Sequence, residues 1–138
     1  MLLLTKLRHG ETFYDLGAGD GRFVIEATRE FGAKSIGVEM DPERVARLKE
    51  RLAATKVNAE VKEGDLMKID LSDADVITIY LSDSVNAKLS PKLLKELKTG
   101  ARVVSLDYVL PGWKHDREVS ISSAGLTRKV YLYTKGPE

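Results

Sequence analysis

Apolar residues in this chain form two patterns, short continuous runs and stripes at helical spacing, and the two patterns alternate along the sequence. The runs are rich in β-branched and aromatic residues and are bounded by turn residues, which is typical of buried strands. They predict strands at 13–16, 35–39, 58–62, 76–80, 101–108, 119–121 and 128–134.

Three segments between these strands predict helices. The first follows a glycine-rich stretch and stops at Gly32, because glycine favours the left-handed conformation that ends many helices. The second starts at Asp41-Pro42 and the third at Ser90-Pro91, since a polar cap followed by proline is a common helix start; the third would end at Gly100. The buried faces are expected to be Phe23, Val24, Ala27, Thr28 and Phe31 in the first helix, Val45, Leu48 and Leu52 in the second, and Leu93, Leu94 and Leu97 in the third.

The order of these elements predicts the architecture. Strands that alternate with helices form parallel sheets, and a terminal pair of strands without a helix between them introduces an antiparallel strand. We therefore expect one α/β domain over residues 1–138, a Rossmann-like, doubly wound, mostly parallel seven-stranded sheet with an antiparallel strand near the C-terminus. The leucine-rich residues 1–7 are expected to be the end of a helix or an apolar arm on the sheet, followed by a turn at Gly10.

Composition narrows the function classes. The net charge of +1 gives no overall field that favours nucleic acid, and the apolar start is too short for a secretory signal or membrane insertion. A sequence without cysteine has no disulfides, zinc–thiolate sites or thiol nucleophiles, which fits the cytoplasm. We assign no metal site and no general base, and we expect His9 and His115 at the surface.

The stretch Asp15-Leu-Gly-Ala-Gly-Asp-Gly-Arg22 is the main candidate for ligand binding. It joins the first predicted strand to the first predicted helix, where glycines let the backbone approach a ligand and free N–H groups carry partial positive charge. In a dinucleotide loop the third glycine comes three residues after the second. Here Gly21 comes one residue early and Arg22 takes its place, so a dinucleotide fits poorly. A plain strand-to-helix turn is the alternative.

The acid before the loop narrows the choice of ligand further. Asp15 would repel a pyrophosphate but could pair with a cationic amine. A ligand that carries both an amine and a nucleoside fits better, and we predict S-adenosylmethionine.

Acidic residues also end the next two predicted strands. Glu39 lies about twenty residues beyond the glycine turn, where an acid can accept both hydrogen bonds of a ribose diol. Asp65 could accept from an adenine amine, with Met40 and Leu66 on the two faces of the ring. Singly, each acid could instead be a helix cap, a solvated strand end or a turn residue. Together, at the carboxyl edge of one sheet, they favour a nucleoside site.

These stretches resemble class I methyltransferases over nearly the whole chain from Phe13 onward. A narrower resemblance is to the small archaeal protein-lysine methyltransferases and to the relatives that methylate the c-subunit of ATP synthase. The matching stretches are residues 15–22, 37–40, 63–66, 78–81 with 85–86, and 102–105 followed by the Pro-Gly-Trp turn at 111–113.

The resemblance implies a role for each matching residue. The methionine end of the cofactor would lie against the loop, the ribose on Glu39 and the adenine beside Asp65. Tyr80 lies where enzymes that methylate amino groups of nucleic acid carry an Asn/Asp-Pro-Pro-aromatic motif, but no proline follows it here. This departure disfavours adenine or glutamine as acceptor and favours protein lysine. The cofactor-binding residues so implied are Asp15, Gly17, Ala18, Gly19, Asp20, Glu39, Met40, Asp65, Leu66 and Tyr80.

A lysine acceptor determines what the active site must do. Its amine must lie in line with the methyl–sulfur bond for direct displacement. It must first lose a proton, which from a pKa of about 10.4 costs about 4.6 kcal/mol at neutral pH. An aromatic channel would lower that cost and hold a methylated product by cation–π contact. Tyr80, Tyr108 and Trp113 are the candidate walls, with core or rim packing as the alternative for these aromatic residues. Asn86 could orient the acceptor, or could simply lie in a short helix.

Other functions stay open on the sequence. An RNA or small-molecule methyltransferase would share the cofactor motifs, and so would a non-catalytic cofactor-binding or nucleotide-binding module. Because the chain begins only a dozen residues before Phe13, we expect a cofactor pocket that is partly open. A neighbouring protomer or the substrate protein could complete it, so homo-oligomerisation is left open.

Overall fold

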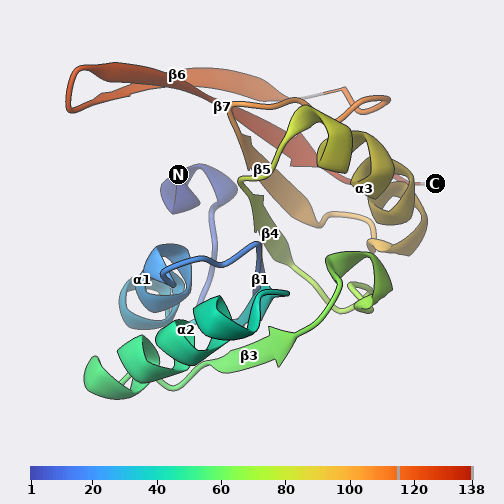
Figure 1. Ribbon diagram of the computed structural model, residues 1–138. Coiled ribbons are helices and arrows are strands. Elements are labelled where there is room, and N and C mark those ends of the chain that lie inside the picture. Colours follow the sequence, from blue (N-terminus) through green and yellow to red (C-terminus); the bar gives the residue numbers. More distant parts are fainter. Residues whose placement is uncertain (115, 138) are drawn as a thin grey trace.

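The computed structural model describes residues 1–114 and 116–137, which form a mixed sheet covered by helices (Figure 1). Its seven strands lie in the order β3-β2-β1-β4-β5-β7-β6. The strands are β1 (Thr12–Leu16), β2 (Lys34–Glu39), β3 (Glu60–Glu63), β4 (Val76–Ile79), β5 (Arg102–Leu106), β6 (Arg117–Ser123) and β7 (Leu126–Thr134). The helices are α1 (Arg22–Phe31), α2 (Pro42–Ala54) and α3 (Asp83–Glu96), with short 3-10 turns η1 (Leu2–Thr5) and η2 (Leu66–Lys68).

The strand directions confirm the predicted fold class. Strands β1 to β5 are parallel, whereas β7 runs antiparallel to both of its neighbours, β5 and β6. The chain starts at β1, winds outward to β3, and then returns to β4 on the other side of β1. Ligands of such sheets bind at this switch point, outside the carboxyl ends of the strands.

Alternation along β1 builds the core on both faces of the sheet. Successive strand residues point to opposite faces, so Phe13 packs with Val24 and Leu48 of α1 and α2, and Tyr14 packs with Leu89 of α3. The Tyr14 hydroxyl donates to Asp73, 2.7 Å away. No helix within residues 1–114 and 116–137 is both long enough and apolar enough to cross a membrane.

The predicted start of the third helix is wrong. Ser82 caps α3 by accepting a hydrogen bond from the Val85 N–H at 3.2 Å, so the Ser90-Pro91 pair lies inside the helix. The Ser90 hydroxyl is not free to cap, because it donates to the carbonyl of Pro111. Leu93 and Leu97 are buried as expected, whereas Leu94, which we also expected to be buried, is 45% exposed.

The C-terminal hairpin is longer than predicted. Strand β6 pairs with β7 along its whole length, from Arg117 opposite Leu132 to Ser123 opposite Leu126. Ala124 and Gly125 form the turn with φ angles of 52° and 78°, the left-handed pair that matches the twist of a two-residue hairpin. The hairpin reaches beyond the end of the sheet on the side of the N-terminal segment (Figure 1).

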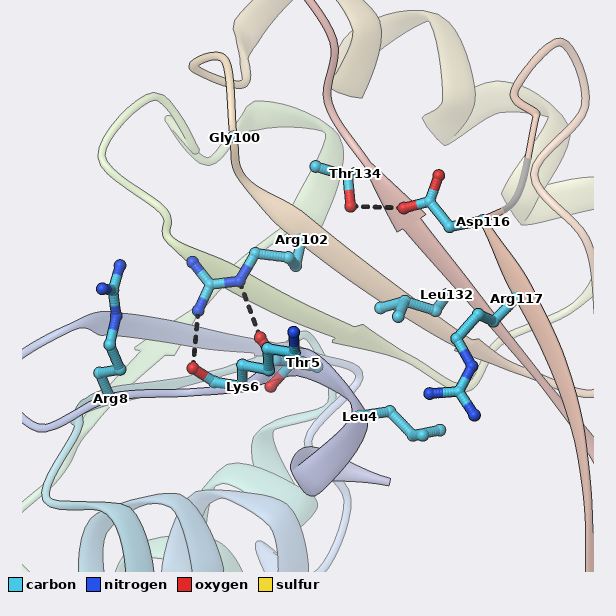
Figure 2. Close-up of a pocket in the computed structure, with 10 residues that line it drawn as sticks. All are labelled: Leu4, Thr5, Lys6, Arg8, Gly100, Arg102, Asp116, Arg117, Leu132 and Thr134. Atoms are coloured by element: carbon cyan, nitrogen blue, oxygen red, sulfur yellow. Dashed lines mark hydrogen bonds between the residues drawn. The ribbon is translucent and has the colours of Figure 1, made fainter.

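The N-terminal segment is an apolar arm on the sheet, which confirms one of the two expected arrangements. Leu2 and Leu7 are buried, and Leu4 packs on the sheet beside β5 and β7. Arg102 of β5 fixes the segment by donating to the carbonyls of Thr5 at 2.8 Å and Lys6 at 3.3 Å (Figure 2).

The cavity in Figure 2 lies at the amino end of β5 and has a volume of about 670 Å³. It lies away from the carboxyl edge where the sheet would bind a ligand. The Arg102 guanidinium in its wall is already occupied by the two carbonyls and by the Glu11 carboxylate, 2.7 Å away. Asp116 in the same wall accepts from Thr134 at 2.5 Å. These internal pairings indicate a structural role.

Glu11→Gln is expected to destabilise the protein by about 2 kcal/mol at pH 7, because it removes a charged, largely buried hydrogen-bond partner of Arg102. The hydrogen bond from Arg102 lowers the pKa of Glu11 from 4.5 to about 2. The Glu11 contribution is therefore complete above pH 4.5 and is lost as pH falls toward 2. Urea unfolding at pH 7 and pH 2.5 would show a difference between variant and wild type that shrinks in acid. Equal differences at the two pH values would contradict this assignment.

Candidate functional site

The glycine loop closes over the carboxyl end of β1. Gly17 and Ala18 donate their N–H groups to the Val38 carbonyl of β2 at 2.9 and 3.1 Å, which fixes the loop to the neighbouring strand. Gly21 precedes α1 with φ of 82°, and a Cβ atom there would clash with the Leu48 side chain. A side chain at this position would therefore strain the backbone and disturb the packing of α1 against α2.

Glu39 ends β2 with a carboxylate that is held in place by the backbone. One oxygen accepts from the Gly19 N–H at 3.2 Å, and the other accepts from Met40 at 3.1 Å and Asp41 at 3.3 Å. The residue is only 7% exposed. A carboxylate offers about four acceptor positions, so Glu39 is oriented before any ligand binds and keeps capacity for a hydroxyl donor.

Asp15 lies in the wall of a cavity beside the glycine loop. It is 4% exposed and accepts a hydrogen bond from the Thr78 hydroxyl at 2.9 Å. Burial raises the pKa of Asp15 to about 7, against the bond from Thr78, and the carboxylates of Asp20 and Glu39 add to the rise. In the described part of the chain no cation pairs with Asp15. A ligand with an ammonium group would supply that missing cation.

The cavity itself has a volume of about 480 Å³. It brings together six of the predicted residues, from the loop and from the end of β4, with side chains of α1 and the C-terminal hairpin. Its lining is Asp15, Gly17, Ala18, Gly19, Asp20, Arg22, Phe23, Tyr80, Leu106, Ala124, Leu126 and Arg128.

The residues predicted to hold adenine lie next to Glu39, outside that lining. Gly64 donates to the Glu39 carbonyl at 3.0 Å, which places the turn after β3 beside the end of β2. Asp65 caps η2 by accepting from the Met67 N–H at 2.9 Å, and Met40 is 66% exposed. The contact of Asp65, Leu66 and Met40 with a nucleobase stays a prediction.

Tyr80 has a partner that the sequence did not reveal. Its side chain follows β4 into the cavity and is 47% exposed. The Arg128 guanidinium of β7 lies 5.2 Å from the centre of the ring and donates to the hydroxyl at 2.5 Å. Asp107 after β5 accepts from the same guanidinium at 2.8 Å. Tyr80 and Arg128 line the cavity, and Asp107 fixes the guanidinium from outside the lining.

The other candidate acceptor residues lie elsewhere. Asn86 is fully buried and donates to the carbonyls of Tyr108 at 3.3 Å and Val109 at 3.1 Å, so it holds the loop after β5. Trp113 packs edge-on against Tyr133 at 5.9 Å and donates to the Ser90 carbonyl at 3.4 Å. The structure does not bring Asn86 or Trp113 to Tyr80, and their contact with an acceptor stays a prediction. His9 is exposed as expected, and His115 lies outside the described residues.

Comparison with known proteins identifies the family in which this arrangement occurs. A family model for the ANTKMT methyltransferase domain matches residues 15–117, which span the glycine loop, the strand ends and the start of β6. This chain belongs to the ANTKMT methyltransferase family. The resemblance to lysine methyltransferases that the motifs predicted is thereby confirmed.

Curated members of the family are similar over most of the chain. A protein-lysine N-methyltransferase of Saccharolobus islandicus is 38% identical over 99% of this chain and 86% of its own length. The mouse adenine nucleotide translocase lysine N-methyltransferase is 36% identical over 96% of this chain and 57% of its own length. The mouse lysine N-methyltransferase of the ATP synthase c-subunit is 33% identical over 80% of this chain and 45% of its own length. This methyltransferase thus spans about half of the mouse proteins.

A solved structure carries the cofactor assignment. The RNA methyltransferase of Salinibacter ruber, in complex with S-adenosyl-L-homocysteine, has a TM-score of 0.90 and 39% identity, covering 99% of this chain and 88% of its own. The present protein is a methyltransferase that uses S-adenosylmethionine, which supplies an activated methyl group when bound. The site fits this cofactor because the cavity offers the buried acid Asp15 for an amine. Glu39, which lies outside the lining but accepts from Gly19 in it, adds an oriented carboxylate for a hydroxyl.

Proposed function

We propose that this methyltransferase acts on a lysine side chain of a protein. The observation that carries the proposal is the Tyr80 ring, which lines the cofactor cavity, is 47% exposed and already contacts a cation, the Arg128 guanidinium at 5.2 Å. A lysine ammonium or its methylated product is bound by an aromatic ring in the same way. The similarity to the Saccharolobus islandicus protein-lysine N-methyltransferase supports the same acceptor.

The chain's own residues would then position the amine and favour its neutral form. No general base is needed if the proton leaves to solvent before the amine enters the cavity. Apolar walls at Phe23, Leu106 and Leu126 disfavour the charged ammonium. We assign Tyr80 as the acceptor-contacting residue, and we assign Asn86 an indirect positioning role through the loop after β5.

RNA is the second candidate acceptor, because the similar Salinibacter protein is described as an RNA methyltransferase. A cavity of about 320 Å³ beside the glycine loop, lined by Gly19, Asp20, Arg44, Arg47 and Arg51, offers arginines for phosphate contacts. Two features argue against RNA: no proline directly follows Tyr80, and the net charge is only +1.

We also propose a cytoplasmic setting, since a sequence without cysteine has no disulfides to form in an oxidising compartment.

One labelling experiment separates these acceptors. The protein is incubated with S-adenosylmethionine carrying a labelled methyl group and with cell extract, which is then treated with protease or ribonuclease. We expect label in protein, recovered as methylated lysine after hydrolysis. Tyr80→Ala is expected to lower labelling at least tenfold while cofactor affinity changes less. Label that resists protease but is released by ribonuclease would replace lysine with RNA as the acceptor.

A further inference from the structure

A small apolar cavity adjoins the cofactor cavity. It has a volume of about 190 Å³ and is lined by Met1, Phe23, Leu106, Ile121, Leu126 and Arg128. Five of these six side chains are apolar. A dry cavity of about 150 Å³ lined by Leu, Ile and Phe is large enough to take benzene. The side cavity therefore has room for one large apolar side chain.

The two cavities share a wall. Phe23, Leu106, Leu126 and Arg128 line both of them, and the shared Arg128 contacts Tyr80 of the cofactor cavity. Arg128 is held there by Tyr80 and Asp107. A substrate whose lysine reaches Tyr80 would place a neighbouring part of its chain over the side cavity.

The rim of the side cavity is exposed in the free protein. Leu126 is 60% exposed and Ile121 is 37% exposed, both in the hairpin that projects beyond the sheet (Figure 1). Covering large apolar side chains is favourable, whereas leaving them in water is not. Because five of its six lining side chains are apolar, the cavity suits an apolar side chain better than a charged one.

We propose that the side cavity receives a large apolar side chain of the protein substrate, two residues from the acceptor lysine in an extended segment. Side chains at positions i and i+2 of an extended chain point to the same side, whereas adjacent ones point to opposite sides. The lysine and its second neighbour can thus enter the two adjoining cavities together. This inference rests on the proposed lysine acceptor and adds a sequence preference to it.

The test uses peptides with one lysine among serines and a single leucine placed two or one residues before or after it. We expect leucine at one of the two outer positions to raise kcat/KM by about tenfold over the all-serine peptide. Ile121→Ser should reduce that ratio to near one, and Ile121→Trp should do the same by filling the cavity. Ile121 lines the side cavity and is absent from the cofactor cavity, so cofactor affinity measured by calorimetry should keep its wild-type value.

Leu94→Ser is the matched control, because Leu94 is an exposed leucine on α3 at 45% exposure. It should leave the tenfold ratio unchanged. Methylation of all peptides at equal rates would overturn the inference and leave the lysine acceptor intact. Methylation of no peptide and of no protein in extract would overturn the proposed function itself. A dimer in sedimentation that Ile121→Ser dissociates would assign the cavity to a second copy of the chain and also overturn the inference.

Discussion

Glu39→Gln is expected to weaken the binding of S-adenosylmethionine by about tenfold to a hundredfold. The carboxylate accepts from three backbone N–H groups and is proposed to accept from the ribose. Glutamine keeps one acceptor oxygen and turns an NH₂ group toward N–H donors. A lost hydrogen bond to a charged group costs about 1.5 to 3 kcal/mol, which corresponds to this range of affinity. Isothermal titration calorimetry measures it directly.

The matched control for this variant is Glu43→Gln, which removes the same charge nearby. Glu43 lies on α2 with an 82% exposed side chain and pairs with Arg47 at 3.3 Å. Such a surface pair contributes little, so its removal should leave cofactor affinity within twofold. Thermal unfolding of both variants checks that the fold is kept. Wild-type affinity in Glu39→Gln would remove the ribose from the end of β2.

The affinity for S-adenosylmethionine is expected to rise with pH between 6 and 8, because Asp15 must lose a proton to pair with the amine of the cofactor. The pKa of Asp15 is about 7 in the free protein. Below that pH each binding event should release a proton, and affinity should change by up to tenfold per pH unit. Calorimetry in two buffers with different ionisation enthalpies counts the protons. Release of no proton at pH 6 would contradict the pairing.

Asp15→Asn provides the comparison for this pH dependence. The variant should bind the cofactor with an affinity that hardly changes with pH and that is at least tenfold weaker at pH 8. Folding stability should change with pH in the opposite direction to cofactor affinity. The folded pKa of Asp15 is raised above its ordinary value of 3.8, so the free wild-type protein should lose stability as pH rises from 4 to 7, and Asp15→Asn should not lose it there.

The sequence predicted those parts of the fold that depend on local signals. Asp41 caps α2 through the Glu43 N–H, and Gly32 ends α1 with φ of 66°, as the residue types indicated. The start of α3 was mispredicted because Ser82 and Ser90 are equally good caps by residue type. In the structure the Ser90 hydroxyl donates to the carbonyl of Pro111, twenty-one residues away, a contact that no local pattern indicates.

In the candidate site, too, some residues could be predicted from local signals and others could not. Asp15 and Glu39 could be placed from the sequence because parallel strands bring their carboxyl ends to one edge. Arg128 could not, since it reaches Tyr80 across 48 residues through a hairpin whose twist no local pattern specifies. A basic residue near the start of the last predicted strand was the sole available signal. Trp113 was assigned to the acceptor from a motif, whereas its packing on Tyr133 depends on how the last strand returns along the sheet.

A crystal structure with S-adenosyl-L-homocysteine bound tests the central claim most directly. Our account predicts the amino group of the ligand beside Asp15, its ribose hydroxyls on Glu39 and its sulfur facing Tyr80. Density for the ligand in any other cavity, or with Asp15 and Glu39 free of contact to it, would contradict the account.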